Sequence, residues 1–205
     1  GALLIFDEIT IGWRLHHGGA HLRFGVHPDI AVFGKALGNG FPMAAVIGTA
    51  AAMEGAHRSF ISSSYWTEGI GPAAALATVR KLARLKAAAH VAAIGAEVTR
   101  LWREHGARHG LPIVSDDGYP CLAHFRFDHP QAEALRTLYT QRMLAHGFLA
   151  GTAIYATLGH TPEIVARYGE AIDAVFAEIA DALAADAVEA RLTGPVAHSG
   201  FRRLL

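Results

Sequence analysis

Short apolar runs at the start of the chain predict buried strands of a sheet. Residues 2–6 form a continuous apolar run that ends in two acidic residues, and residues 30–33 form a second run that ends in a glycine and a lysine. Runs of this length, bounded by turn residues, are typical of buried parallel strands. About two dozen residues separate the runs, which is enough for the crossover that a parallel pair requires. A third strand is predicted over residues 43–49.

Beyond Pro72 the apolar spacing changes to that of helices. An alanine-rich helix is predicted over residues 72–85, with its proline in the first turn, where proline is tolerated. Apolar residues then recur at intervals of three and four, which predicts three further helices. These helices cover residues 91–105, 135–143 and 162–183, and Thr161 caps the last of them. Strands are expected at 121–127 and, one or two of them, within 148–158.

These elements predict an α/β chain in two parts. Residues 1–86 contribute a mostly parallel sheet, and residues 87–205 form a smaller α/β domain. The sequence starts at Gly1, inside the first predicted strand, so we expect the chain to be a fragment of a longer protein.

Composition narrows the class of protein. Hydrophobic residues make up 52% of the chain and charged residues 18%, which indicates a globular protein. Basic and acidic residues both number 18, so a basic face for nucleic acid or for an anionic membrane is not expected. No apolar run approaches the roughly 18 residues of a membrane span. The single cysteine, Cys121, excludes an internal disulfide and suits a reducing cytoplasm.

Lys35 and Asp7 are the first candidates for chemistry. Lys35 lies between a buried strand and a glycine-rich turn, where partial desolvation would favour its neutral, nucleophilic amine. Taken alone, a lysine at the end of a strand is more often one that reaches into solvent. Parallel strands end at the same edge of a sheet, however, so Asp7 and Lys35 would project from the same carboxyl edge. A lysine and a buried carboxylate at one edge suit pyridoxal phosphate (PLP), whose pyridine nitrogen needs an acid to stay protonated.

Other reactive side chains are weaker candidates. His16, His17 and His21 form a cluster, but only the last two have an i, i+4 spacing, and no carboxylate lies near them in the sequence. No metal site is therefore expected. Residues 62–64 are serines without the Gly-x-Ser-x-Gly turn of a serine hydrolase.

Several motifs together resemble the core of class III aminotransferases over about forty residues. They are Leu4-Ile5-Phe6-Asp7-Glu8-Ile9, Gly12-Trp13-Arg14, Gly18-Gly19-Ala20, Pro28-Asp29-Ile30 and Gly34-Lys35-Ala36-Leu37-Gly38-Asn39-Gly40-Phe41-Pro42. Further on, His160-Thr161-Pro162-Glu163 is similar to a small-domain motif of the glutamate-1-semialdehyde aminomutase branch.

The resemblance implies the second half of a PLP enzyme of fold type I, with residues 1–86 in the large domain and 87–205 as the small domain. In the family, the residue at Asp7 pairs with the pyridine nitrogen, that at Ile9 packs on the ring face, and that at Lys35 forms the Schiff base. The residue matching Thr67 binds the phosphate of the neighbouring subunit, which implies a homodimer. The family's phosphate cup would lie before Gly1.

Two departures limit what the resemblance implies about the substrate. Ile11 stands where the family usually has threonine, and residues 155–158 lack the arginine with which many members bind a substrate carboxylate. The expected activity is transfer of an amino group between an amine or amino acid and a carbonyl compound. The alternatives are a glutamate-1-semialdehyde-type aminomutase, or an inactive truncated homologue that acts as a dimerisation module.

Overall fold

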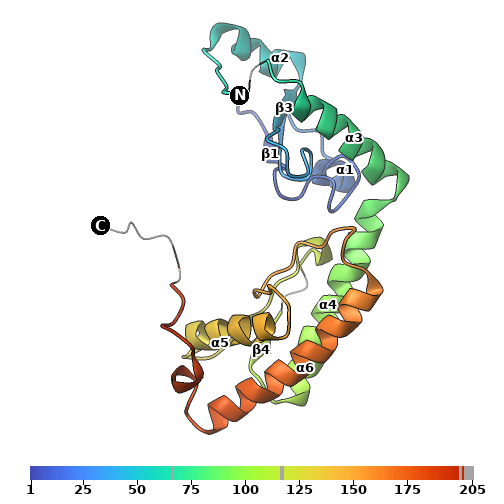
Figure 1. The fold of residues 1–205 in the computed structure, drawn as a ribbon. Coiled ribbons are helices and arrows are strands. Elements are labelled where there is room, and N and C mark those ends of the chain that lie inside the picture. Colours follow the sequence, from blue (N-terminus) through green and yellow to red (C-terminus); the bar gives the residue numbers. More distant parts are fainter. Residues whose placement is uncertain (66, 116–117, 199, 201–205) are drawn as a thin grey trace. The chain divides into compact units, whose positions relative to one another are not determined.

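The computed structural model describes residues 1–65, 67–115, 118–198 and 200. The chain divides into two compact units, Gly1–Ala92 and Ala93–Leu205 (Figure 1). The boundary falls inside one helix, α4 (Ala87–Arg108), and each unit is described by itself.

The first unit contains a sheet of three strands within its described residues, in the order β1 (Ile5–Asp7), β2 (Ile30–Phe33) and β3 (Ala45–Gly48). The first two strands are parallel, with Ile5 opposite Ile30, as predicted. The third strand is antiparallel to β2. Residues 34–44 join these two strands without a helix, and a connection of this kind suits antiparallel pairing, because a parallel crossover needs a dozen or more residues.

Short helices accompany the strands of this unit. Helix α1 (Ala20–Phe24) lies between the parallel strands, and α2 (Ala50–Met53) and the 3-10 helix η1 (Glu54–Arg58) follow β3. The longer α3 (Ile70–Arg84) begins two residues before the predicted start, so that Pro72 lies in its first turn.

Helix α3 covers one face of the sheet. Its Ala75 joins Ala31 and Phe33 in the buried core of the unit, and Trp13 packs against Phe33 with ring centroids 4.9 Å apart. Burial of this apolar surface stabilises the unit. Strand β1 differs from the prediction of a buried strand, because the described chain covers little of it, and β3 is similarly open. Ile5 and Ile47 are each more than half exposed.

The second unit is built mainly from three helices: the later part of α4, α5 (Ala132–Ala145) and α6 (Pro162–Ala184). Thr161 caps α6 by accepting a hydrogen bond from the Ile164 amide at 3.4 Å. The smaller elements are β4 (Ile113–Val114), β5 (Arg126–Phe127), and the 3-10 helices η2 (Pro120–Leu122) and η3 (Glu189–Arg191).

The predicted strands of this unit are shorter than expected. Residues 120–122 form η2, because Pro120 has no amide hydrogen for a ladder and favours a first helical turn. Within 148–158 the structure has a single antiparallel bridge, between Ala153 and His124. Hydrogen bonds from the Phe125 amide to the Thr152 carbonyl and from the Ile154 amide to the Ala123 carbonyl, both 2.9 Å, hold it.

Aromatic side chains fill the core between these elements. Phe125 is buried and packs edge-on against Tyr139 and Phe176, with ring centroids 5.3 and 6.1 Å away, and it also contacts Trp102 at 4.9 Å. Edge-on pairs of this kind are the favoured geometry of aromatic rings. They tie β5, α4, α5 and α6 into one core.

A carboxylate links α4 to α6. Oδ1 of Asp173 makes hydrogen bonds with Nδ1 of His105 at 2.9 Å, Nε2 of His109 at 2.7 Å and Nη1 of Arg108 at 3.0 Å. The hydrogen bond from His109, together with those from the other two residues, lowers the pKa of Asp173 from 3.8 to about 2. The folded state therefore favours the ionised carboxylate.

This pKa shift predicts a pH-dependent contribution to stability. A carboxyl whose folded pKa is lowered stabilises the protein above its unfolded pKa, and the contribution disappears as the pH falls towards the folded value. We expect Asp173→Asn to lower the urea midpoint of the chain at neutral pH, and this deficit to shrink between about pH 4 and pH 2. Asp181→Asn, an exposed acid on the same helix, is the control. A deficit that does not change with pH would contradict the assignment.

Candidate functional site

The pairing of β1 with β2 brings Asp7 and Lys35 to one edge of the sheet. Asp7 ends β1 opposite Val32, and Lys35 follows β2 two residues after its last residue. Both side chains are exposed, although Lys35 was expected to be partly desolvated and Asp7 buried. For Asp7 the difference arises because β1 has only β2 as a strand neighbour in the described part of the chain.

The carboxylate of Asp7 is oriented by the loop that follows it. Its Oδ1 accepts a hydrogen bond from the Ile9 amide at 2.9 Å, while the Glu8 amide continues the strand ladder to the Val32 carbonyl at 2.8 Å. Oδ2 makes no hydrogen bond with the described residues. One carboxylate oxygen is thus fixed, and the other is available to a ligand.

At Lys35 the backbone departs from the extended conformation of β2, and the side chain contacts Thr10. Its backbone has a φ of 40°, in the left-handed region, where a non-glycine residue is uncommon. Its Nζ donates a hydrogen bond to Oγ1 of Thr10 at 2.6 Å. Ile9, next to Thr10, lies against Gly34, since a Cβ on Gly34 would be 3.4 Å from Ile9 Cγ2. The structure therefore brings Lys35, Ile9 and Asp7 to one loop cluster and adds Thr10, which the sequence did not indicate.

Glu8 links the loop after β1 to the start of α1. Its side chain is 1% exposed and accepts hydrogen bonds from the amides of Ala20 and His21, both at 2.9 Å, and its Oε1 lies 2.8 Å from His21 Nδ1. A buried carboxylate is stable only when it is satisfied in this way. Gly19 is required here because a Cβ would lie 2.8 Å from Glu8 Oε1.

The sequence shows no carboxylate close to His16, His17 and His21, but the structure places Glu8 beside His21. The hydrogen bond between these two side chains holds the loop that connects β1 to β2. Among the described residues, no group of three or more His, Cys, Asp or Glu side chains is arranged to hold a metal ion.

Thr67 lies in the segment between η1 and α3, where it is exposed. An open cavity of about 490 Å³ lies beside this segment, with Met43, Ser63, Tyr65 and Glu68 among its lining residues. No contact joins Thr67 to Asp7, Ile9 or Lys35 in the described residues.

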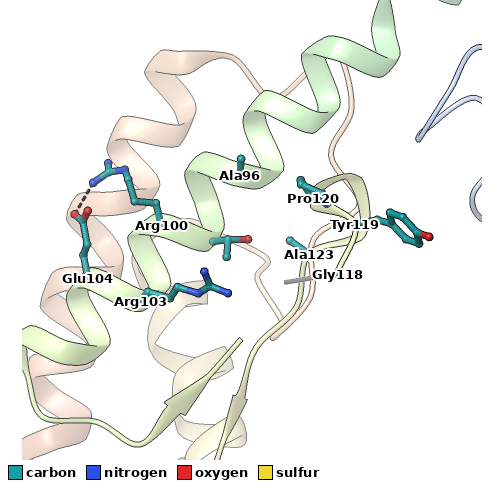
Figure 2. A pocket seen from close by; sticks show the side chains of 9 residues that line it. Ala96, Arg100, Arg103, Glu104, Gly118, Tyr119, Pro120 and Ala123 are labelled. Atoms are coloured by element: carbon teal, nitrogen blue, oxygen red, sulfur yellow. Dashed lines mark hydrogen bonds and ion pairs between the residues drawn. The ribbon is translucent and has the colours of Figure 1, made fainter. Parts of the chain in front are cut away.

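The cavity of about 470 Å³ shown in Figure 2 lies in the second unit and has a different character. Arg100, on its wall, pairs with Glu104 and with Glu97, and these hydrogen bonds raise the pKa of the guanidinium. Arg103 donates to the Ser115 carbonyl at 2.9 Å. Among the described residues the two glutamates balance the charge of the two arginines, so these four side chains give the cavity no excess of positive charge.

The loop cluster of the first unit has a donor set that fits the pyridine half of PLP. It offers an accessible primary amine, an oriented carboxylate and a branched apolar side chain beside them. An amine can attach an aldehyde, a carboxylate can hold a proton on a ring nitrogen, and an apolar side chain can cover a ring face.

Comparisons with known proteins identify the fold and the family of the chain. The fold of the chain matches that of solved PLP-dependent transaminases. The FumI protein of Sphingopyxis sp. MTA144, in a PLP-bound form, aligns with a TM-score of 0.82 and 24% identity over 90% of this chain and 45% of that one. An ω-transaminase of Sphaerobacter thermophilus aligns with a TM-score of 0.75 and 24% identity, over 88% of this chain and 45% of that one. The chain therefore has part of the fold type I architecture of PLP enzymes.

The sequence comparison identifies the family. The family model described as aminotransferase class III matches residues 1–183, so the chain belongs to the class III aminotransferases. It is 36% identical over 187 residues to 3-aminobutyryl-CoA aminotransferase of Cloacimonas acidaminovorans, which covers 86% of this chain and 44% of the relative. It is 31% identical over 197 residues to a glutamate-1-semialdehyde 2,1-aminomutase of Desulfosudis oleivorans, covering 87% and 46%. The chain thus spans about half the length of the curated relatives it matches. The family and the PLP-bound structures support PLP as the cofactor.

The contact between Lys35 and Thr10 predicts a change in the reactivity of a single lysine. Thr10→Val keeps the shape of the side chain but removes the acceptor for Lys35 Nζ. A typical hydrogen bond contributes about 0.5–1.5 kcal/mol, so we expect Lys35 to react roughly two- to tenfold faster with an amine-specific acylating reagent. Mass spectrometry of the labelled peptides gives the rate at each lysine. Thr10→Ser should behave like the wild type, and Lys81 should be unaffected in all three proteins.

Proposed function

We propose that this chain provides half of the active site of a PLP-dependent aminotransferase, with the cofactor attached through Lys35. The enzyme moves an amino group from a small-molecule amine or amino acid to a carbonyl acceptor. The observation that carries the proposal is the placement of Asp7 and Lys35 at one carboxyl edge of a parallel strand pair. Open α/β sheets bind their ligands at that edge.

Each residue of the loop cluster has a chemical role in this proposal. When bound, PLP supplies an electron sink for bonds broken next to the amino group. Lys35 provides the amine that attaches the cofactor and then carries a proton to and from the substrate carbon. Asp7 holds a proton on the ring nitrogen, and Ile9 covers the ring face. The phosphate would be held by residues outside this loop cluster.

The domain assignment is part of the same proposal. We assign residues 1–86 to the cofactor-binding large domain and residues 87–205 to the small domain. The described residues include no helix long and apolar enough to cross a membrane. A cytoplasmic location stays a prediction.

An aminomutase is the second candidate. The relative from Desulfosudis oleivorans and the motif at residues 160–163 favour it, as does the absence of an arginine at 155–158. An aminomutase returns the amino group to the same carbon skeleton, whereas a transaminase requires a second substrate. A transaminase would convert a 15N-labelled donor only when a carbonyl acceptor is added, and an aminomutase would isomerise glutamate-1-semialdehyde alone. A protein without either activity would support the third hypothesis, an inactive truncated homologue that acts as a dimerisation module.

We include a homodimer in the proposal because the segment that carries Thr67 has exposed apolar side chains. Phe60 is 96% exposed, and Ile61 and Ile70 are each more than half exposed. Large apolar side chains left exposed near one another in the sequence suit a segment that another chain covers. In the proposed dimer, Thr67 reaches the phosphate in the site of the neighbouring subunit.

Attachment through Lys35 is tested by trapping. The protein encoded by the complete reading frame is loaded with PLP, reduced with borohydride and digested, and the pyridoxyl mass is located by mass spectrometry. We expect it on the peptide that contains Lys35. Lys35→Ala should still bind PLP through the phosphate but lose turnover by several orders of magnitude, because the nucleophile and the proton carrier are lost together. A pyridoxyl mass on a peptide without Lys35 would show that the assignment is wrong.

The role of Thr67 is tested with mixed dimers. Its hydroxyl would donate one hydrogen bond to a charged phosphate, worth about 1.5–3 kcal/mol, so Thr67→Ala should weaken PLP binding about ten- to a hundredfold. If Thr67 serves the neighbouring site, a dimer of one Lys35→Ala and one Thr67→Ala subunit has both defects in one site and an intact second site. We expect each mixed dimer to regain one intact site of two, so a randomly paired mixture should reach roughly a quarter of the wild-type activity at a PLP concentration that leaves the Thr67→Ala dimer empty. No recovery would mean that Thr67 serves its own chain or no phosphate.

A further inference from the structure

His21, the second residue of α1, contacts both strands that lead to the candidate site. Its ring packs edge-on against Phe6 of β1, with ring centroids 6.2 Å apart, and against Phe33 of β2, with ring centroids 6.4 Å apart. This is a favoured geometry of aromatic rings. Phe6 immediately precedes Asp7, and Phe33 lies two residues before Lys35. One side chain from the connection between β1 and β2 therefore touches both of the strands that carry the proposed reactive groups.

The same side chain is hydrogen-bonded to the residue that follows Asp7. Nδ1 of His21 lies 2.8 Å from Oε1 of Glu8, whose side chain has no exposed surface. The amides of Ala20 and His21 can only donate to this carboxylate, so its oxygens act as acceptors, and Nδ1 is assigned as the third donor. Through Glu8, His21 is thus connected to the point at which Asp7 leaves the strand.

The position of the imidazole depends on Gly19. A Cβ on this residue would lie 2.6 Å from Nδ1 and 2.7 Å from Cε1 of His21, so a larger residue would push the ring away from Glu8. The side chain of His21 is only 15% exposed. A ring that is enclosed by its neighbours and held by a hydrogen bond has a defined rotamer, which a residue needs if it is to orient others.

We propose that His21 is a positioning residue of the candidate site. It links β1 to β2 by its ring and, through Glu8, fixes the direction in which the Asp7 carboxylate leaves the sheet. The proposal rests on the proposed function for the role of that carboxylate, whereas the link itself does not involve PLP. The Ile9 amide reports on the link, because Ile9 follows Glu8 directly and its amide donates to Oδ1 of Asp7 at 2.9 Å.

Two substitutions separate the hydrogen bond of His21 from its ring packing. His21→Phe keeps a ring against Phe6 and Phe33 but removes the donor to Glu8. His21→Asn removes the ring but has an amide N–H group at the position of Nδ1, so it keeps the donor. Thr49→Ala is the control, because the Thr49 hydroxyl caps α2 and its loss destabilises the same unit at a different place. Melting curves give the loss of stability in each variant.

The first measurement is amide hydrogen exchange, followed by mass spectrometry, in the protein encoded by the complete reading frame and without PLP. A hydrogen bond to a charged group is worth about a factor of ten or more in an equilibrium, so we expect the Ile9 amide to exchange about tenfold faster in His21→Phe. The rate in His21→Asn should stay close to that of the wild type. Thr49→Ala should leave this amide unchanged.

The second measurement uses the holoenzyme, loaded with PLP that carries 15N at the ring nitrogen. The chemical shift of this nitrogen shows whether it is protonated. We expect His21→Phe to move the shift towards that of an unprotonated ring, because Asp7 is no longer held in place. A displacement of about 1 Å can lower a rate by about a hundredfold, so we expect kcat to fall by about tenfold, with a smaller change in KM. His21→Asn should restore both the shift and kcat.

Unchanged exchange of the Ile9 amide in His21→Phe would overturn His21 as a positioning residue, whatever reaction the protein catalyses. Changes of equal size in Thr49→Ala at an equal loss of melting temperature, or in His21→Asn, would do the same. Faster exchange with an unchanged nitrogen shift and kcat would overturn the effect on Asp7. A wild type that does not attach PLP to Lys35 would instead overturn the proposed function, and the exchange rates would still decide the role of His21.

Discussion

Parallel pairing of two short strands is the constraint on which the candidate site depends. Because β1 and β2 run in the same direction, Asp7 and Lys35 leave the sheet at the same edge although they are far apart in the sequence. An antiparallel pair would place them at opposite edges, and no rotation of side chains could then bring a carboxylate and an amine to one ligand. The reactive groups are therefore positioned by the topology of the sheet, and the loop after β1 refines that position.

The same arrangement explains why the site looks incomplete in this chain. In the described residues β1 has one strand neighbour, and Ile5 and Ile47 are open to solvent. Exposed backbone groups and apolar side chains of this kind favour association with another polypeptide segment. The chain spans about half of the length of the relatives it matches.

Features that depend on local chemistry could be predicted from the sequence, and those that depend on distant packing could not. The strand at residues 30–33, the helix capped by Thr161 and the shared edge of Asp7 and Lys35 follow from periodicity, capping and the crossover rule. The direction of β3 was left open, and the strand expected at 121–127 is largely replaced by η2 and a bridge. Thr10 and Glu8 were missed because a threonine or an acid in a loop gives no periodic signal, and their roles appear only when Lys35 and α1 are placed beside them. The role of Thr67 stays a prediction.

The bonds of Glu8 have a consequence for the order in which the first unit folds. They join residues 12 and 13 positions apart, whereas β1 pairs with residues 25 positions away. Contacts between nearby residues require less loop closure, and closing a ten-residue loop takes about 10–100 ns. The turn that carries Ile9 and Thr10 can therefore form early, as a local nucleus, and β2 would then dock on a loop that already has the shape needed to receive Lys35.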